Sequence, residues 1–272
     1  HVDDGVQIIA HRGASIKAPE NTLAAVERAI ADSADWVEID VQETADNRVV
    51  VFHDSDFKKT AGNPLKIWDA TMEDLAELDI GSWFSPEFSA ERTPTLEEVL
   101  EISRGKSGVL IELMYYGHDR QLEQRVLDIV TELGMEDSVQ LMSLKPAAVS
   151  KLKAIRPDLP AGLLLSVVAG NTSNLEADFL AVNAGLADRT FINSVHRDGR
   201  EVYVWTVNDV PTMITMLSRG VDGVITDRPA MARAVLAEWL SMEPVERLVL
   251  DMASVMGVLP DGEEYGQGDD DA

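Results

Sequence analysis

The chain has 272 residues, of which 45% are hydrophobic and 26% are charged, and this length is enough to bury the core of one large globular domain. Its 48 acidic residues outnumber the 23 Lys and Arg residues, and the resulting net charge of -25 argues against binding to nucleic acids or anionic lipid surfaces. Cysteine is absent, which excludes disulfides and a thiolate nucleophile, so any chemistry has to use other side chains.

Apolar runs rich in Val, Ile and Leu recur along the chain and predict strands. The nine runs cover residues 7–10, 36–41, 49–52, 108–113, 138–142, 162–166, 179–182, 202–207 and 223–226. Most are separated by segments with helical periodicity, which cover residues 23–30, 96–102, 121–133, 145–155, 211–218, 230–240 and 245–256. This alternation predicts a parallel sheet, and runs that are apolar on both faces favour its closure into a TIM-type (β/α)8 barrel.

Short polar residues mark where several of these helices begin. Asn21 and Thr22 precede the first helical segment, where either side chain can cap the helix. Thr95 has an acidic residue three positions later, the spacing of a capping box, and Thr71 shows a weaker form of the same pattern.

Nine runs exceed the eight strands of the barrel by one. The link at 43–48 is too short for a parallel crossover, so we expect the second and third runs to form a hairpin or an irregular strand. Residues 54–94 interrupt the alternation and are expected to form an insertion at one end of the barrel. We therefore predict one catalytic domain over residues 1–260 and an acidic disordered tail over 261–272.

Two histidines stand where apolar strands end. Ile8-Ile9-Ala10 runs into His11 and Arg12, and the run at 49–52 leads into His53. In a barrel this is the catalytic end, so both histidines are candidates for acid–base catalysis, against the alternative of a hydrogen-bonded core histidine. The remaining histidines, His1, His118 and His196, fall in the terminus or in predicted loops and are expected to be exposed.

Three carboxylates lie on predicted barrel strands. Glu38 and Asp40 alternate with apolar residues and so share one face of their strand, and Glu112 ends the next barrel strand in the same way. Close carboxylates in a barrel interior require either protonation or a cation, and oxygen ligands without cysteine favour Ca²⁺ or Mg²⁺ over Zn²⁺. The alternative is three independent carboxylates, each paired with Arg or Lys.

Six blocks of the sequence, taken in order, resemble glycerophosphodiester phosphodiesterases. They are HRGASIKAPENT at 11–22, VEIDVQET at 37–44, VVVFHD at 49–54, IEL at 111–113, VYVWTVN at 202–208 and GVDGVITDRP at 220–229. The resemblance implies a TIM barrel and a divalent metal. It also implies hydrolysis of glycerophosphodiesters to glycerol 3-phosphate and an alcohol, and a small subdomain beside the substrate pocket at 54–94.

The resemblance also implies roles for individual residues. The acid–base pair is His11 and His53, the substrate-binding residues are Arg12, Glu20, Asn21 and Trp205, and the metal ligands are Glu38, Asp40 and Glu112. For Asn21 a helix cap explains the residue equally well, and for Trp205 the alternative is a core tryptophan. Asp227 is expected to be a loop or cap residue. The departure from the family is Met114, because relatives usually place there a lysine that reaches the phosphate.

Two other functions remain open at this stage. A lysophospholipase-D-like enzyme would keep the barrel and act on monoacyl substrates, and a binding module would keep the pocket with weak turnover. The attacking group is either water or the adjacent glycerol hydroxyl, which would give a cyclic phosphate. Oligomeric state, preferred alcohol and native metal are not determined by the sequence.

No apolar run approaches the roughly 20 residues that span a bilayer, and no signal-peptide pattern is present, so we expect a soluble domain. The sequence begins at His1 rather than at methionine. We therefore expect a processed chain or part of a longer, exported or membrane-anchored protein, and the compartment stays open.

Overall fold

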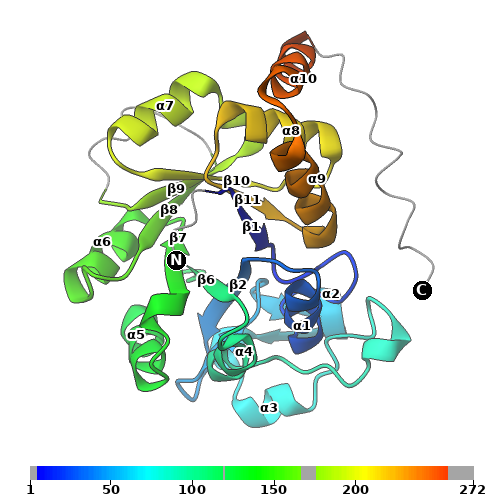
Figure 1. Ribbon diagram of the computed structural model, residues 1–272. Helices are drawn as coiled ribbons and strands as arrows, with labels where there is room; N and C mark the ends of the chain where they lie inside the picture. Colours follow the sequence, from blue (N-terminus) through cyan, green and yellow to red (C-terminus); the bar gives the residue numbers. More distant parts are fainter. Residues whose placement is uncertain (1–4, 119, 167–175, 257–272) are drawn as a thin grey trace.

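The computed structural model describes residues 5–118, 120–166 and 176–256, and its centre is a closed barrel of eight parallel strands (Figure 1). In chain order the strands are β1 (Gln7–Ala10), β2 (Trp36–Glu43), β6 (Gly108–Leu113), β7 (Val139–Ser143), β8 (Ala161–Leu165), β9 (Phe179–Asn183), β10 (Glu201–Trp205) and β11 (Gly223–Thr226). Neighbours in the barrel follow chain order, and β1 closes the sheet by pairing with both β2 and β11. The predicted TIM-type barrel is confirmed.

Helices surround the barrel (Figure 1). They are α1 (Leu23–Ala31), α4 (Leu96–Ser103), α5 (Leu122–Glu132), α6 (Pro146–Ile155), α7 (Arg189–Arg197), α8 (Val210–Arg219) and α9 (Pro229–Ser241), followed by α10 (Pro244–Met256), which contacts α8. Short 3-10 turns η3 (Glu136–Ser138) and η4 (Ala184–Leu186) lie in connections. Helix α7 is absent from the predicted set, although Asp188 caps it and Ile192 and Val195 are buried. The predicted acidic tail at 261–272 lies outside the described residues.

The third predicted strand, β3 (Val49–Val51), is not part of the closed barrel. It runs antiparallel to β2, with Val51 opposite Val41, and forms the predicted hairpin. The next residue, Phe52, donates its backbone N–H to the carbonyl of Asp40 at 2.9 Å. This hairpin therefore returns the chain from the end of β2 to the level of Asp40, directly before His53.

The barrel interior is packed with side chains. Its inner apolar cluster comprises Ile9, Leu110, Met142, Phe179, Ala181, Tyr203 and Ile225. Gly162 makes room for one of these rings, because a Cβ there would lie 2.0 Å from Cε2 of Phe179. Since rings fill the interior, polar chemistry is confined to the barrel ends.

The insertion between β3 and α4 has its own small core. It contains β4 (Asp56–Phe57), α2 (Lys58–Ala61), β5 (Asn63–Lys66), η1 (Ile67–Asp69), α3 (Met72–Ala76) and η2 (Pro86–Phe88), shown in cyan in Figure 1. Phe57, Ile67, Leu75 and Ile80 are buried together against the β3 hairpin. A complete capping box at Thr71 begins α3, so the weaker sequence pattern there is a real cap. Fold and insertion therefore agree with the prediction.

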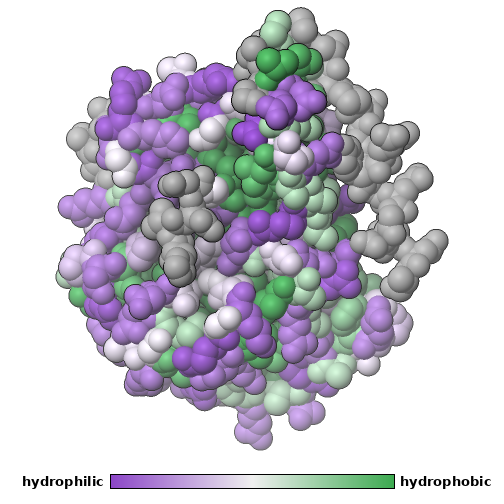
Figure 2. Space-filling model, in the orientation of Figure 1, coloured by the Kyte–Doolittle hydropathy of each residue, from purple (hydrophilic) through white to green (hydrophobic). Residues whose placement is uncertain are grey.

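Hydrophilic side chains cover most of the face seen in Figure 2, and apolar atoms gather at the surface of α10. Exposed apolar residues on that helix are Val245, Val249 and Met252. Within the described part of the chain, no helix combines the length and the apolar character needed to cross a bilayer.

Candidate active site

The predicted site residues gather where the barrel strands end at their carboxyl termini. His11 follows β1 and His53 follows the β3 hairpin. Glu38 and Asp40 lie at alternate positions of β2, and Glu112 lies beside Asp40 in the register of β6 with β2. Because parallel strands end at one mouth of the barrel, these side chains from distant parts of the sequence meet.

The three carboxylates form a buried cluster. Glu38, Asp40 and Glu112 are 1%, 1% and 7% exposed, and each offers an oxygen within 4.8 Å of the others. Burial and the neighbouring carboxylates raise the pKa of Glu38 well above its usual range and that of Glu112 to about 8. Three close oxygen ligands on rigid strands fit a hard divalent cation, which would remove the cost of ionising them.

Arg12 is the one cation that forms an ion pair with this cluster in the described part of the chain. Its backbone N–H donates to Glu38 Oε2 at 2.9 Å, and its Nε lies 3.2 Å from Asp40 Oδ2 without hydrogen-bond geometry. Its Nη1 donates to Glu20 Oε1 at 3.2 Å. The arrangement differs from three carboxylates that each have their own Arg or Lys, because one guanidinium faces several acids.

Asn21 orients Asp40. Its Nδ2 donates to Asp40 Oδ2 at 2.8 Å, and its Oδ1 accepts the backbone N–H of Asp40 at 3.2 Å. The helix cap of α1 is Thr22, whose hydroxyl accepts the N–H of Ala25, so the capping explanation does not apply to Asn21. Asn21 also has a positive φ of 57°, a conformation that asparagine tolerates better than most residues.

His11 is held by Asp227, which the sequence reasoning assigned to a loop or cap. His11 Nδ1 lies 2.7 Å from Asp227 Oδ1, and Asp227 also accepts from Ser15 Oγ at 2.9 Å and from Asn208 Nδ2 at 2.5 Å. Although burial acts to raise it, the hydrogen bond and charge of His11 and the other donors lower the pKa of Asp227 to about 2. Asp227 lies in the loop between β11 and α9, as one of the two predicted alternatives has it, and the cap position of α9 is Arg228; the contact of Asp227 with His11 was not predicted.

His53 has a similar partner but a more exposed setting. Its Nδ1 lies 2.8 Å from Asp54 Oδ1, and the side chains are 29% and 35% exposed. Gln42, which shares the inward face of β2, donates to the carbonyls of Phe52, His53 and Asp54 at 2.7, 3.1 and 2.9 Å. Tyr116 OH also donates to the His53 carbonyl at 2.8 Å. Neither Gln42 nor Tyr116 was predicted as a site residue, although alternation along β2 places Gln42 on the same face as Asp40.

Trp205 and Met114 are half-buried near the same end of the barrel. Trp205 ends β10 and packs on the inner apolar cluster, and its buried indole Nε1 has no hydrogen-bond partner among the described residues. Met114 directly follows β6 and donates its backbone N–H to the Val41 carbonyl at 3.0 Å. Trp205 therefore combines core packing with a buried donor that lacks a protein acceptor among the described residues, an arrangement that costs free energy.

Two further histidines are not part of the acid–base pair, and one of them, His118, lies in the loop that follows β6 at the same end of the barrel. His118 is exposed and stacks on Trp68 with ring centroids 3.9 Å apart. His196 is exposed as expected, but it lies on α7 rather than in a loop and pairs with Asp222 at 2.7 Å. Asp222 precedes β11, so this pair lies at the opposite end of the barrel from His11.

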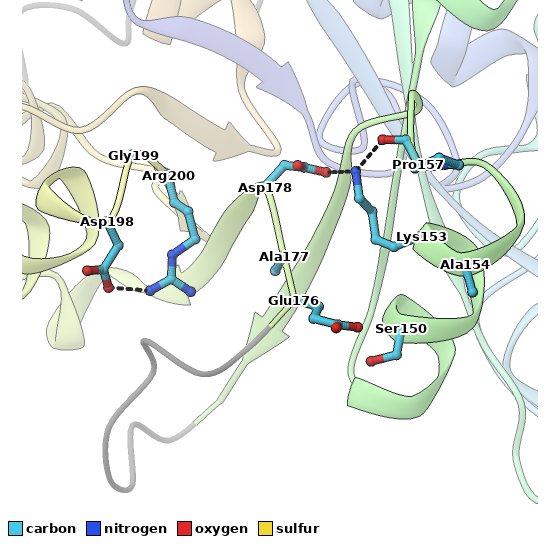
Figure 3. A pocket seen from close by; sticks show the side chains of 10 residues that line it. All are labelled: Ser150, Lys153, Ala154, Pro157, Glu176, Ala177, Asp178, Asp198, Gly199 and Arg200. Carbon is cyan, nitrogen blue, oxygen red and sulfur yellow. Dashed lines mark hydrogen bonds and ion pairs between the residues drawn. The ribbon is translucent and has the colours of Figure 1, made fainter.

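A cavity of about 680 Å³ also lies at the opposite end, lined by residues that precede β8, β9 and β10. Two ion pairs line it, as Figure 3 shows: Lys153 with Asp178 and Arg200 with Asp198, each at 2.8 Å. This cavity contains none of the predicted site residues.

Comparison with known proteins agrees with this geometry. The model of the glycerophosphoryl diester phosphodiesterase family matches residues 11–231, most of the chain. The chain belongs to this family. YhdW of Bacillus subtilis is 36% identical over 231 residues, which cover 82% of this chain and 94% of that protein. A glycerophosphodiester phosphodiesterase of Caldanaerobacter subterraneus is 32% identical over 235 residues, with the same coverage of 82% and 94%.

A solved structure resembles most of the chain. It is an Oleispira antarctica phosphodiesterase in complex with the product sn-glycerol-3-phosphate, with a TM-score of 0.81 and 28% identity over 85% of this chain and 96% of that one. Together with membership of the glycerophosphoryl diester phosphodiesterase family, these relatives make the chain an enzyme, a phosphoric diester hydrolase.

Proposed function

We propose that the chain hydrolyses glycerophosphodiesters to glycerol 3-phosphate and an alcohol, using His11 and His53 as an acid–base pair and a divalent metal held by Glu38, Asp40 and Glu112. The observation that carries the proposal is the position of both histidines, each with a carboxylate on Nδ1, at the barrel end that holds the buried carboxylate cluster. The product bound to the Oleispira antarctica relative supports the choice of substrate.

The two carboxylates orient the imidazole rings of the histidines. Asp227, ionised because of its low pKa, holds a proton on Nδ1 of His11 and leaves Nε2 to exchange a proton with substrate. Asp54 is placed to do the same for His53. One histidine then takes the proton of the attacking hydroxyl, and the other donates a proton to the departing alkoxide oxygen. Water or the adjacent glycerol hydroxyl can be the attacking group.

The chain's own residues bind and orient the diester. Arg12, which stands between the carboxylate cluster and Glu20, is proposed to contact a nonbridging phosphate oxygen. The unpartnered indole N–H of Trp205 is proposed to donate to a substrate oxygen, while Asn21 holds Asp40 in place. When bound, a divalent cation supplies Lewis-acid stabilisation of the phosphate oxygens, and the oxygen-only ligand set favours Ca²⁺ or Mg²⁺.

A second candidate function has a specific observation in its favour. Four large apolar side chains that are exposed lie in the insertion or in loops that follow barrel strands: Ile16, Trp83, Tyr116 and Leu144, at 48%, 39%, 42% and 50% exposure. Such a rim could contact an acyl chain, as in a lysophospholipase-D-like enzyme. The presence of both histidines and all three carboxylates favours either enzyme over a binding module.

Turnover of deacylated and monoacylated substrates, measured side by side, tests these proposals. With Ca²⁺ or Mg²⁺ present we expect release of choline or another alcohol from a glycerophosphodiester, loss of the rate on exhaustive chelation, and its return when the metal is restored. Glu112→Gln should weaken metal binding while circular dichroism shows an intact fold. Full activity after chelation would exclude the carboxylate site, and preference for lysophosphatidylcholine would favour the second function.

A further inference from the structure

One cation of the insertion reaches the catalytic end of the barrel. Lys59, on α2, donates from Nζ to Glu20 Oε2 at 3.1 Å. The other oxygen of Glu20 accepts from Arg12 Nη1 at 3.2 Å. A single carboxylate therefore joins the ammonium group of the insertion to the guanidinium group beside the carboxylate cluster, and it places Lys59 one side chain away from Arg12.

The same ammonium group occupies an aromatic face. Lys59 Nζ lies 4.9 Å from the ring centroid of Trp83, which is 39% exposed and packs edge-on against Phe84. The face of a tryptophan is the best protein site for a quaternary ammonium group. Here Lys59 already covers one face of the Trp83 ring, and its ion pair with Glu20 holds it there.

The charges on this side of the site have a direct consequence for the substrate. Glu20 pairs with both Lys59 and Arg12, and Arg12 also pairs with Asp40, so the positive charge that lies against the Trp83 ring is the ammonium group of Lys59. A cationic group that approaches Trp83 meets like charge and an occupied ring, whereas a neutral or anionic group meets an ammonium group that can donate hydrogen bonds.

We propose that Lys59 determines alcohol specificity and selects diesters with neutral or anionic alcohols, such as inositol, over those with choline. This inference rests on the proposed function and assigns the alcohol of the diester to the side of the site formed by the insertion. The insertion begins directly after His53, so an alcohol that leaves from this side departs past Lys59 and Trp83.

The test compares kcat/KM for glycerophosphoinositol and glycerophosphocholine. The wild-type protein should have the higher kcat/KM for glycerophosphoinositol. Lys59→Gln should lower the ratio of the two kcat/KM values by about tenfold, mainly because KM for glycerophosphocholine falls. Lys59→Arg keeps the charge and should keep the preference. In Lys59→Gln the choline group can contact the Trp83 ring, so the double variant Lys59→Gln/Trp83→Leu should lose the improvement in kcat/KM for glycerophosphocholine.

Lys58→Gln is the matched control, since it removes the same charge from the neighbouring residue. The Lys58 side chain is 67% exposed, and its Nζ lies 3.7 Å from Oδ2 of Asp56, which also belongs to the insertion. An unchanged ratio in Lys59→Gln, or an equal change in Lys58→Gln, would overturn the specificity role while leaving the diesterase activity standing. Lack of turnover of both diesters by wild type with metal would instead remove the proposed function, and this inference with it.

Discussion

Residues of the site share a position that the sequence reveals, directly after a strand or at alternate positions along one. His11, His53, Glu38, Asp40 and Glu112 could be found in this way because their apolar neighbours define the strand. Asp227 follows β11 and obeys the same rule. It was assigned to a loop or cap because an aspartate before Arg-Pro also fits a turn, and only the distance to His11 separates the two roles.

Removal of either histidine tests the acid–base assignment. General acid–base groups typically contribute about 10²–10⁴-fold, so His11→Ala and His53→Ala should each lower kcat by a factor in that range. The double variant should lose much less than the product of the two losses, because the pair acts as a unit. Steady-state kinetics on one diester measure kcat for the two single variants and the double variant. A near-normal kcat in either single variant would show that the histidine has a structural role and not a catalytic one.

Met114 offers a gain-of-function test. If the side chain faces the substrate, Met114→Lys restores a charge-assisted hydrogen bond to phosphate and should raise kcat/KM on a small glycerophosphodiester by about tenfold to a hundredfold. The gain should shrink at high salt and for substrates with a bulky apolar group. A rate that stays equal or falls on every diester tried would mean that Met114 packs away from phosphate, or that Arg12 or Lys59 already supplies the charge.

At the level of elements, the strands were predictable because each barrel strand is a short apolar run between turn residues. The hairpin of β2 and β3 followed from loop length alone. Helix α7 was missed because its sequence, RTFINSVHR, has few strong helix formers, and burial of Ile192 and Val195 against the barrel supplies what helix propensity lacks. The position of the insertion could be predicted, but its helices and strands could not, because elements of two to five residues are too short to show a periodic pattern.

The insertion core gives a prediction about stability. Phe57 is fully buried and contacts Phe52 with ring centroids 4.6 Å apart. Phe57→Ala removes contacts with Phe52 and with the rest of the insertion core, so it should lower the free energy of unfolding by about 3–5 kcal/mol. Phe84→Ala changes a partly buried ring and should cost clearly less. Urea unfolding measures the loss of unfolding free energy in each variant. Equal losses for Phe57→Ala and Phe84→Ala would contradict the conclusion that the insertion has its own core around Phe57.

For the whole molecule, closure of the barrel could be predicted because eight apolar runs and their helices span the chain. The meeting of Glu38, Asp40 and Glu112 then follows from closure, since β2 and β6 are neighbours. Contacts that depend on side-chain reach across loops, such as Gln42 to three carbonyls and Lys59 to Glu20, could not be predicted from residue order. The first depends on the path of the chain directly after β3, and the second depends on where the insertion packs on the barrel.

The carboxylate cluster should make the stability of the whole chain depend on pH and metal together. In the metal-free protein Glu112 keeps its proton up to a pKa of about 8, while its ordinary pKa is 4.5, so the folded state binds more protons between these values. Stability of the metal-free protein should therefore fall as pH rises through this window, by on the order of a few kcal/mol. Ca²⁺ or Mg²⁺ needs the ionised carboxylates, so its stabilising effect should grow over the same window.

Thermal unfolding at pH 5, 6, 7 and 8, with chelator or with excess metal, measures this coupling. The gap between the two Tm values should widen with pH, and Glu112→Gln should both flatten the metal-free slope and narrow the gap, because glutamine neither titrates nor supplies charge to a cation. Glu101→Gln makes the same change at a side chain that is 54% exposed on α4, and it should behave as wild type. A Tm gap that stays constant from pH 5 to pH 8 would show that Glu112 does not exchange its proton for a metal.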